Sequence, residues 1–186
     1  MPQPKRNFSY GFIAILILFA ALSRLIPHPP NFAPMGAMAL FGAAYFKKKH
    51  LALLVPLIAL WISSLIIDNT IAAQYYDGFQ WFTNPFVYLG MIAIVGLGWL
   101  TLRRPNVQSV LASALGASIV FFLISNFGVW LQWVPEKNFA TLSATFAAGV
   151  PFFHWTLLSD VFYCAVLFGA YEMAADRGWV LRPSQV

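Results

Sequence analysis

Four side chains able to do chemistry lie within or at the ends of long apolar runs. Asp160 lies in the run 151–175, at a depth of about 13 Å if that run is helical at 1.5 Å per residue. Asn126 lies at a comparable depth in the run 107–133, His154 lies near the start of 151–175, and Arg24 lies near the end of the run 10–26. Ionisable groups inside a membrane span are costly and are therefore the first functional candidates. The spacing predicts a polar cluster in one half of a helical bundle.

Loop and aromatic residues extend this cluster to a predicted ligand-binding set. Its ten members are Arg24, His28, Asn31, Asn69, Trp81, Asn126, Trp130, His154, Asp160 and Tyr163. Each type of residue also has a purely structural interpretation. Asp160 would pair with Arg24 or share its proton with Asn126, the histidines would lie in a solvated loop or at the interface, and the aromatic rings would form an interfacial belt. The sequence leaves both interpretations open.

Metal, cofactor and enzyme chemistry have little support in the sequence. The single cysteine, Cys164, lies inside an apolar run, so one chain cannot build a disulfide framework or a thiolate metal cage. A two-histidine haem would require His28 and His154 to face each other, and nothing in their spacing favours that. There is no His-Glu-x-x-His motif, nucleophile elbow or phosphate-binding glycine loop. We therefore predict no metal, no cofactor and no catalysis, with a membrane enzyme as a minor alternative.

Composition points to lipid as the surroundings of this chain. Of its 186 residues, 60% are hydrophobic and only 9% are charged, whereas soluble domains carry about 25% charged residues. So few charges cannot cover a surface in water. The net charge of +5 comes from short basic clusters between apolar runs, which is a topology signal rather than a nucleic-acid-binding stripe. We predict a single transmembrane domain over residues 1–186 and no nucleic-acid partner.

Six apolar runs are long enough, or nearly so, to cross a bilayer as helices, for which about 20 residues are needed. None alternates as the strands of a membrane barrel do. The fold class we expect is an all-α membrane protein, a compact bundle of six transmembrane helices. The expected spans are 10–26, 32–46, 51–67, 85–102, 107–133 and 151–175.

Basic residues predict the orientation of these spans. If six spans alternate, only Arg24 and Lys137 of the eleven lysines and arginines fall on one side. The other nine fall on the opposite side: Lys5, Arg6, Lys47, Lys48, Lys49, Arg103, Arg104, Arg177 and Arg182. The positive-inside rule then places both termini in the cytoplasm. The location we expect is the bacterial inner membrane, with multiple spans.

The connections on the two sides of the membrane differ in length. The predicted outer segments 27–34, 68–84 and 134–150 are long, whereas the inner turns are tight, so the functional surface is expected outside. Small residues line one face of the run 32–46, and Ser109, Ser113 and Ala117 form a small-residue row in the run 107–133. These faces would pack within the bundle or dock against another membrane subunit, and the sequence does not choose between the two.

Three stretches carry a resemblance to a known group of proteins. They are the segment 21–46, with its proline-rich loop and small-residue helix, the run 124–130 and the segment 151–169. Together with the six-span layout they resemble the S-component, the substrate-binding membrane subunit of energy-coupling factor vitamin transporters. The last two stretches also resemble an uncharacterised bacterial family of the same architecture.

This resemblance implies uptake of a vitamin-like small molecule bound on the outer side. It also implies a transmembrane coupling subunit with ATPases as a partner. The first span carries Ala14, Ala20 and Ala21 without the regular alanine spacing used for such docking, so a solitary member is an alternative. Cys164 does not match the outer-loop cysteine of the solitary cobalamin transporters. If a corrinoid is bound, the candidate cobalt ligands are therefore His28 and His154. The rival interpretation is a non-catalytic accessory subunit of a larger membrane complex.

Overall fold

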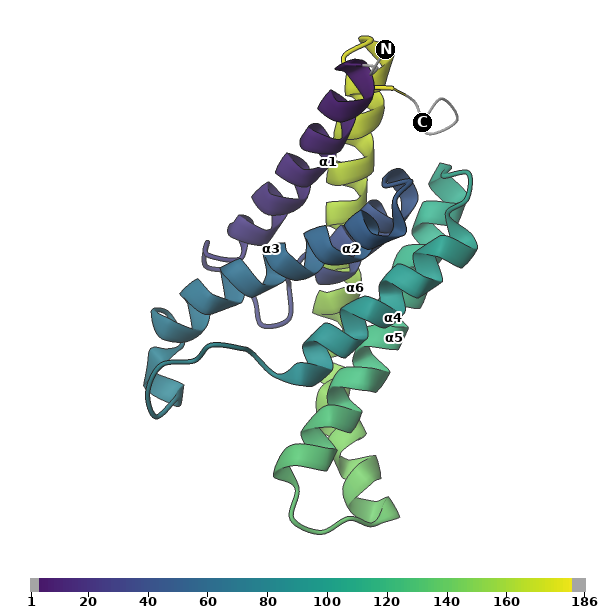
Figure 1. Ribbon diagram of the computed structural model, residues 1–186. Coiled ribbons are helices and arrows are strands. Elements are labelled where there is room, and N and C mark those ends of the chain that lie inside the picture. The colour runs from purple at the N-terminus through teal and green to yellow at the C-terminus, as the bar shows by residue number, and fades with distance from the viewer. Residues whose placement is uncertain (1–3, 182–186) are drawn as a thin grey trace.

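The computed structural model describes residues 4–181, which form six α-helices, one short 3-10 helix and no strand (Figure 1). The helices are α1 (Pro4–Ser23), α2 (Met35–Tyr45), α3 (Lys49–Asn69), α4 (Pro85–Thr101), α5 (Val107–Trp133) and α6 (Phe139–Asp176), with η1 (Ala73–Tyr75) between α3 and α4. The all-α prediction is thus confirmed for this part of the chain. Arg182 and the side chains of Lys5 and Arg6, which entered the orientation argument, lie outside the described residues.

Three of the helices, α3, α5 and α6, are long and apolar enough to cross a membrane, and together they indicate a membrane protein. The remaining apolar helices are shorter: 9–23 within α1, α2 and α4. Their surfaces are also apolar. Phe19 is 72% exposed on α1, Ile58 51% on α3 and Leu100 72% on α4. Large exposed apolar side chains on every side of a molecule suit hydrocarbon better than water.

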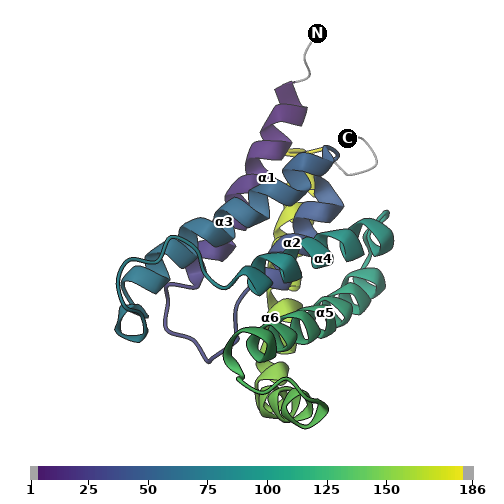
Figure 2. The same cartoon turned by 60° about the horizontal axis from the view of Figure 1, so that its bottom comes forward.

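Helix α2 lies in the middle of the molecule and contacts all five other α-helices (Figures 1 and 2). Nine of its eleven residues are buried: Gly36, Ala37, Met38, Ala39, Leu40, Phe41, Gly42, Ala43 and Tyr45. Small side chains allow the neighbouring backbones to approach. A methyl group added at Gly98 of α4, for example, would lie 2.6 Å from the Cβ of Ala43. The small-residue face of α2 is therefore used inside this chain.

The small-residue row of α5 packs within the chain as well. Ser113 and Ala117 are buried, and the Ser113 hydroxyl donates a hydrogen bond of 2.7 Å to Thr101 Oγ1 at the end of α4. Ser109 instead helps to cap α5, where its amide bonds to the Asn106 side chain at 2.9 Å. Ser113 and Ala117 thus pack within the bundle, whereas Ser109 caps α5.

Helix α6 begins at Phe139, twelve residues before the predicted start of the sixth span at 151. Its start is fixed by a capping box, in which the Asn138 side chain accepts from the Thr141 amide at 2.9 Å. Pro151 then lies inside the helix rather than at its beginning. Most of the segment 134–150, expected as an outer loop, is therefore the first third of a 38-residue helix.

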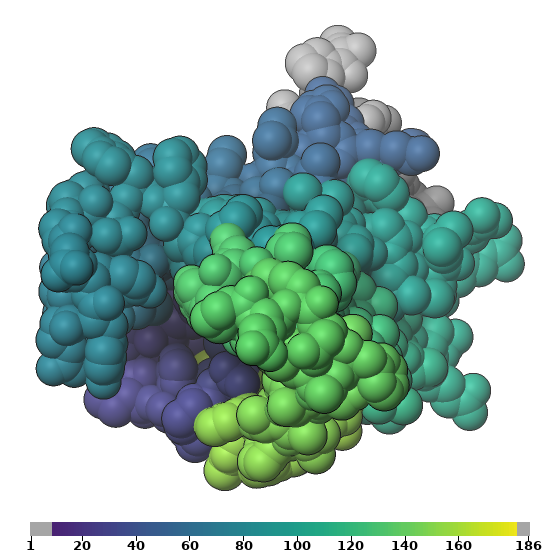
Figure 3. All heavy atoms as spheres, turned by 90° about the horizontal axis from the view of Figure 1, so that it is seen from below, coloured from purple at the N-terminus to yellow at the C-terminus, as the bar shows by residue number. Residues whose placement is uncertain are grey.

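The start of α1 and the end of α6 lie at one end of the molecule (Figure 1). The Ser9 hydroxyl of α1 accepts from the Leu181 amide at 3.0 Å, and the Tyr171 hydroxyl of α6 donates to the Leu181 carbonyl at 2.8 Å. The α5–α6 loop lies at the opposite end (Figure 1). The face that contains this loop is hollowed between the segments around residues 30, 75 and 140 (Figure 3).

Candidate functional site

A cavity of about 530 Å³, called here the first cavity, lies at the end of the molecule that contains the α5–α6 loop. Residues from the α1–α2 loop, α2, α4, α5 and α6 surround it. They are Asn31, Met35, Val87, Phe121, Phe122, Ser125, Asn126, Val129, Thr145, Ala148, Gly149, Phe152, Phe153 and Thr156. Ligand sites in proteins have volumes of about 300–1,000 Å³ and apolar walls with a few polar groups. The first cavity has both properties.

Aromatic rings form one wall of the first cavity. Phe122 of α5 packs edge-on against Phe153 of α6 at 5.3 Å between ring centroids, and against Phe146 at 5.7 Å. These contacts hold α5 and α6 together with a ring at the cavity surface. Phenylalanine rings supply large apolar area and favour flat partners.

The polar groups of the first cavity are amides and hydroxyls. The Asn126 side chain donates from Nδ2 to the Phe122 carbonyl at 2.8 Å, which fixes its orientation on α5. Gly149 of α6 lies directly against this side chain, because a methyl group at Gly149 would come within 2.9 Å of Asn126 Cγ. Ser125, Thr145 and Thr156 add hydroxyls. No charged side chain lines the cavity within the described residues.

Asp160 lies deeper in the bundle and does not line the first cavity. Its carboxylate accepts a hydrogen bond of 2.7 Å from Ser118 Oγ on α5 and one of 3.2 Å from the Ala37 amide at the start of α2. The residue before α2 is Pro34, whose side chain makes no capping bond. Asp160 therefore caps the N-terminus of α2 from another helix, where a carboxylate also suits the helix dipole.

Arg24 binds helix α3 rather than Asp160. Its Nη1 donates to Ser63 Oγ at 2.6 Å and to Ser64 Oγ at 3.0 Å, and Asp68 of α3 interacts with it electrostatically. These bonds join the loop after α1 to the second half of α3. A pair between Arg24 and Asp160, one of the two structural interpretations of Asp160, does not form, and Arg24 links α1 to α3 instead.

We expect Arg24→Ala to lower stability by about 2 kcal/mol, because two buried serine hydroxyls lose a charged donor. For a chain of this length that is a fall of roughly 4–8 °C in Tm. The measurement is thermal unfolding in mild detergent, with Arg104→Ala as the control because Arg104 is exposed in the α4–α5 turn. Equal melting temperatures for the two variants would contradict a stabilising link at Arg24.

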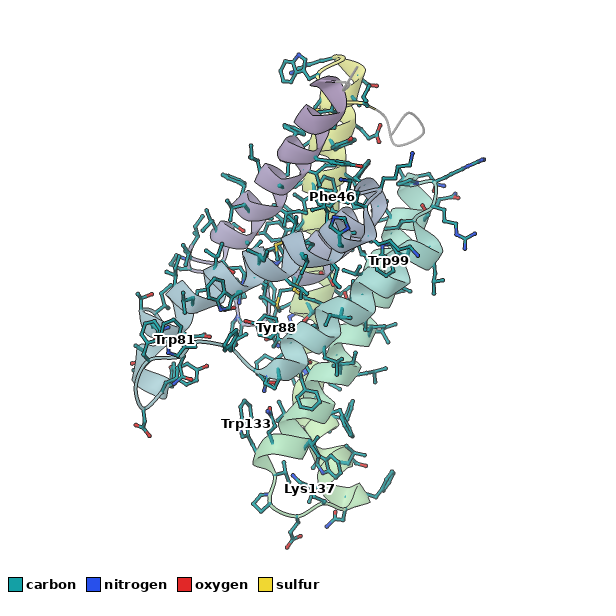
Figure 4. The ribbon with its side chains drawn as sticks, viewed as in Figure 1. Phe46, Trp81, Tyr88, Trp99, Trp133 and Lys137 are labelled. Atoms are coloured by element: carbon teal, nitrogen blue, oxygen red, sulfur yellow. The ribbon has the colours of Figure 1, made fainter. Side chains whose placement is uncertain are left out.

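Four more predicted residues make contacts elsewhere. The Tyr163 hydroxyl of α6 lies 2.7 Å from Ser23 Oγ, and Trp130 Nε1 donates to Thr141 Oγ1 at 3.0 Å, beside the α5–α6 loop. Asn69 bonds both to the amide and to the carbonyl of Gln80, each at 2.8 Å, and so fixes the segment after α3. Trp81 lies in that segment, far from the loop that contains Lys137 (Figure 4).

The two predicted histidines are exposed. His154 packs on Trp155 at 4.7 Å between ring centroids, and His28 Nδ1 lies 3.1 Å from the Pro29 carbonyl. Of the ten predicted residues, the structure thus brings only Asn31 and Asn126 together at the first cavity. The single cluster expected around Asn126, His154 and Asp160 does not form, because Asp160 is taken up by α2 and His154 points to the surface.

Sequence reasoning missed most of the cavity wall. Ser125, Thr145 and Thr156 are short polar residues of types that are common in membrane helices, and Thr145 fell in a segment expected to be a loop. One sequence pattern does indicate part of this wall. Ala148, Gly149, Phe152, Phe153 and Thr156 follow the three- and four-residue spacing of one helix face.

A protein-family model described as a family of unknown function (DUF6580) matches residues 4–181. No curated protein and no solved structure matches the chain.

Proposed function

The chain belongs to this family, and we propose that it is a membrane protein that binds one uncharged, largely apolar small molecule in the first cavity for uptake into the cell. The observation that carries the proposal is the cavity itself, about 530 Å³ with phenylalanine walls and five amide- or hydroxyl-bearing side chains. Such a lining recognises a flat ligand with neutral hydrogen-bonding groups. It offers no charged partner for an ionic ligand.

The proposed topology has six spans with both termini in the cytoplasm of a bacterium, across its inner membrane. Three helices are long and apolar enough to span, and we propose that the shorter apolar helices in α1, α2 and α4 complete the six spans together with their flanking residues. The start of α1, the end of α6 and the basic turns 46–50 and 102–106 lie toward one end of the molecule, as the positive-inside rule requires (Figure 1). The first cavity then opens on the outer half, where an incoming ligand arrives.

This role is of the kind that S-components perform, which is the resemblance carried by residues 21–46. The proposed ligand is vitamin-like in size. A coupling subunit with ATPases is the proposed partner where uptake requires energy. The alternative, an accessory subunit of a larger complex, gains no support from the small-residue faces, because α2 and the inner row of α5 are buried within this chain.

The test is to identify what the protein holds when it is purified in mild detergent. We expect solvent extraction and mass spectrometry to find one small neutral compound with the wild type. Ala148→Phe puts a ring into the first cavity and is expected to reduce the retained compound at least about tenfold, since its site is filled. Ala147→Phe is the matched control, because Ala147 is exposed one position away and does not line the cavity.

Two results would contradict the proposal. One is that no compound is recovered from wild-type protein that is folded and monodisperse. The other is that Ala148→Phe and Ala147→Phe retain the compound equally.

A further inference from the structure

A second cavity, of about 570 Å³, lies between α5 and α6 toward the other end of the molecule. Its walls come from the end of α2, the α4–α5 turn, the start of α5 and the second half of α6. The lining residues are Tyr45, Pro105, Asn106, Val107, Val110, Leu111, Val161, Cys164, Ala165, Phe168, Gly169 and Glu172. One polar pair marks it, since the Tyr45 hydroxyl donates to Glu172 Oε1 at 3.0 Å.

The two cavities follow one face of α6. Thr156 lines the first cavity, Cys164 lines the second, and Asp160 lies midway between them. Residues four apart lie above one another on a helix, and eight residues span about 12 Å. Only one or two helical turns thus separate the cavities along α6.

Helix α5 also borders both cavities, but its residue numbers fall from the first cavity to the second. Phe121 and Phe122 belong to the first cavity, Val110 and Leu111 belong to the second, and Ser118 lies between them. Helix α2 also passes from one cavity to the other, with Met35 in the first and Tyr45 in the second. The same three helices therefore border both cavities.

A hydrogen-bonded layer lies between the cavities. Asp160 accepts from Ser118 Oγ at 2.7 Å and from the Ala37 amide at 3.2 Å, so α6, α5 and α2 are joined at this level. Ser118 and Asp160 are 0% and 1% exposed. A methyl group at Gly36 would lie 2.6 Å from Asp160 Oδ2, so the layer has no spare volume. We call Asp160, Ser118, Gly36 and Ala37 the barrier layer.

We propose that the two cavities are the two ends of one passage between α5 and α6, and that the barrier layer is its gate. The proposal rests on ligand binding in the first cavity and adds a route through this chain and a second site, at Tyr45 and Glu172, on the far side of the gate. Opening requires α6 to move away from α5 by breaking the bond between Ser118 and Asp160. Pro151 has no amide hydrogen and cannot donate the helical hydrogen bond to the preceding turn. The first third of α6 can therefore bend relative to the rest.

The test measures from which face of the membrane each cavity can be reached. Cys164→Ala removes the native thiol, and single cysteines are then placed by Ser125→Cys in the first cavity and by Gly169→Cys in the second. A methyl group at Gly169 meets no atom within 4 Å, so this substitution fits. The probe is a charged, membrane-impermeant methanethiosulfonate added to one face of sealed vesicles. Glu136→Cys, in the exposed α5–α6 loop, identifies the face of the first cavity.

We expect Ser125→Cys to react from the Glu136 face and Gly169→Cys from the opposite face. Adding Ser118→Ala to Gly169→Cys is expected to raise its reaction from the Glu136 face about tenfold, because one hydrogen bond of the gate is lost. Ser113→Ala, which removes a buried hydroxyl of α5 outside the barrier layer, is the matched control. Asp160→Asn keeps the size of the side chain and serves as a second gate variant, with a rise of several-fold expected.

Reaction of Gly169→Cys at equal rates from both faces, or from neither, would overturn the passage, and these outcomes do not depend on whether Ser118→Ala folds. Unchanged rates in both gate variants would overturn the gate. Any of these results would remove only the passage if the wild type still retains a compound and Ala148→Phe does not. The binding proposal would then stand. If no compound is bound but Gly169→Cys reacts from one face only and the gate variants change its rate, the passage stands and the binding proposal is removed.

Discussion

Gly36→Ala is expected to lower the stability of the protein by about 3 kcal/mol, a fall of roughly 10 °C in Tm, because the added methyl group has no space. It would lie 2.6 Å from Asp160 Oδ2 in a fully buried layer. Either Asp160 moves away from the start of α2 or α2 moves away from α6. Both movements break the bond from the Ala37 amide.

The matched control is Gly96→Ala in α4, where a new methyl group meets no atom within 4 Å. Alanine is the better helix former there, so this variant is expected to be as stable as the wild type or up to about 1 kcal/mol more stable. Thermal unfolding of both variants in the same detergent makes the comparison. If Gly36→Ala melts together with Gly96→Ala, the barrier layer is not packed as described.

Asp160→Leu is expected to cost about 3 kcal/mol, although leucine suits an apolar interior better than a carboxylate does. The reason is the start of α2, where the Ala37 amide would lose its acceptor in a buried position. Asp160→Asn keeps a carbonyl oxygen that can accept from that amide. We expect it to recover at least half of the lost stability.

The comparison of these two variants distinguishes a helix cap from a simple buried charge. If the Asp160 carboxylate were only a destabilising buried charge, Asp160→Leu would be more stable than the wild type. Replacing buried ionic groups by apolar ones often has this effect. The measurement is again thermal unfolding, supplemented by proteolysis at the segment 24–34 that leads into α2. Wild-type stability in Asp160→Leu would contradict the capping role.

Much of the fold can be predicted from the sequence because the length of an apolar run and the capping residues at its ends are local properties. The runs 51–67, 85–102 and 107–133 correspond to α3, α4 and α5 within a few residues. The sixth span was predicted to start at 151, whereas the capping box of Asn138 and Thr141 starts α6 at Phe139. A proline ends a helix in water, but within a bundle neighbouring groups can satisfy the freed carbonyl.

The candidate site was less predictable because its members depend on how the helices pack. Asp160 was singled out for its depth, yet a buried carboxylate is also satisfied by the amides of another helix, and no local pattern reveals that α2 begins beside it. Asn126 lines the first cavity, whereas His154 is exposed on the surface of α6. Which face of a long helix points inward is decided by its neighbours.

The most direct test of small-molecule binding is the native mass of the intact protein released from lipid nanodiscs. We predict a monomer carrying one bound small molecule in the wild type and in Ala147→Phe, and a bare monomer in Ala148→Phe. A wild-type chain that appears only bare, or only together with other membrane chains, would contradict a binding protein and favour an accessory subunit.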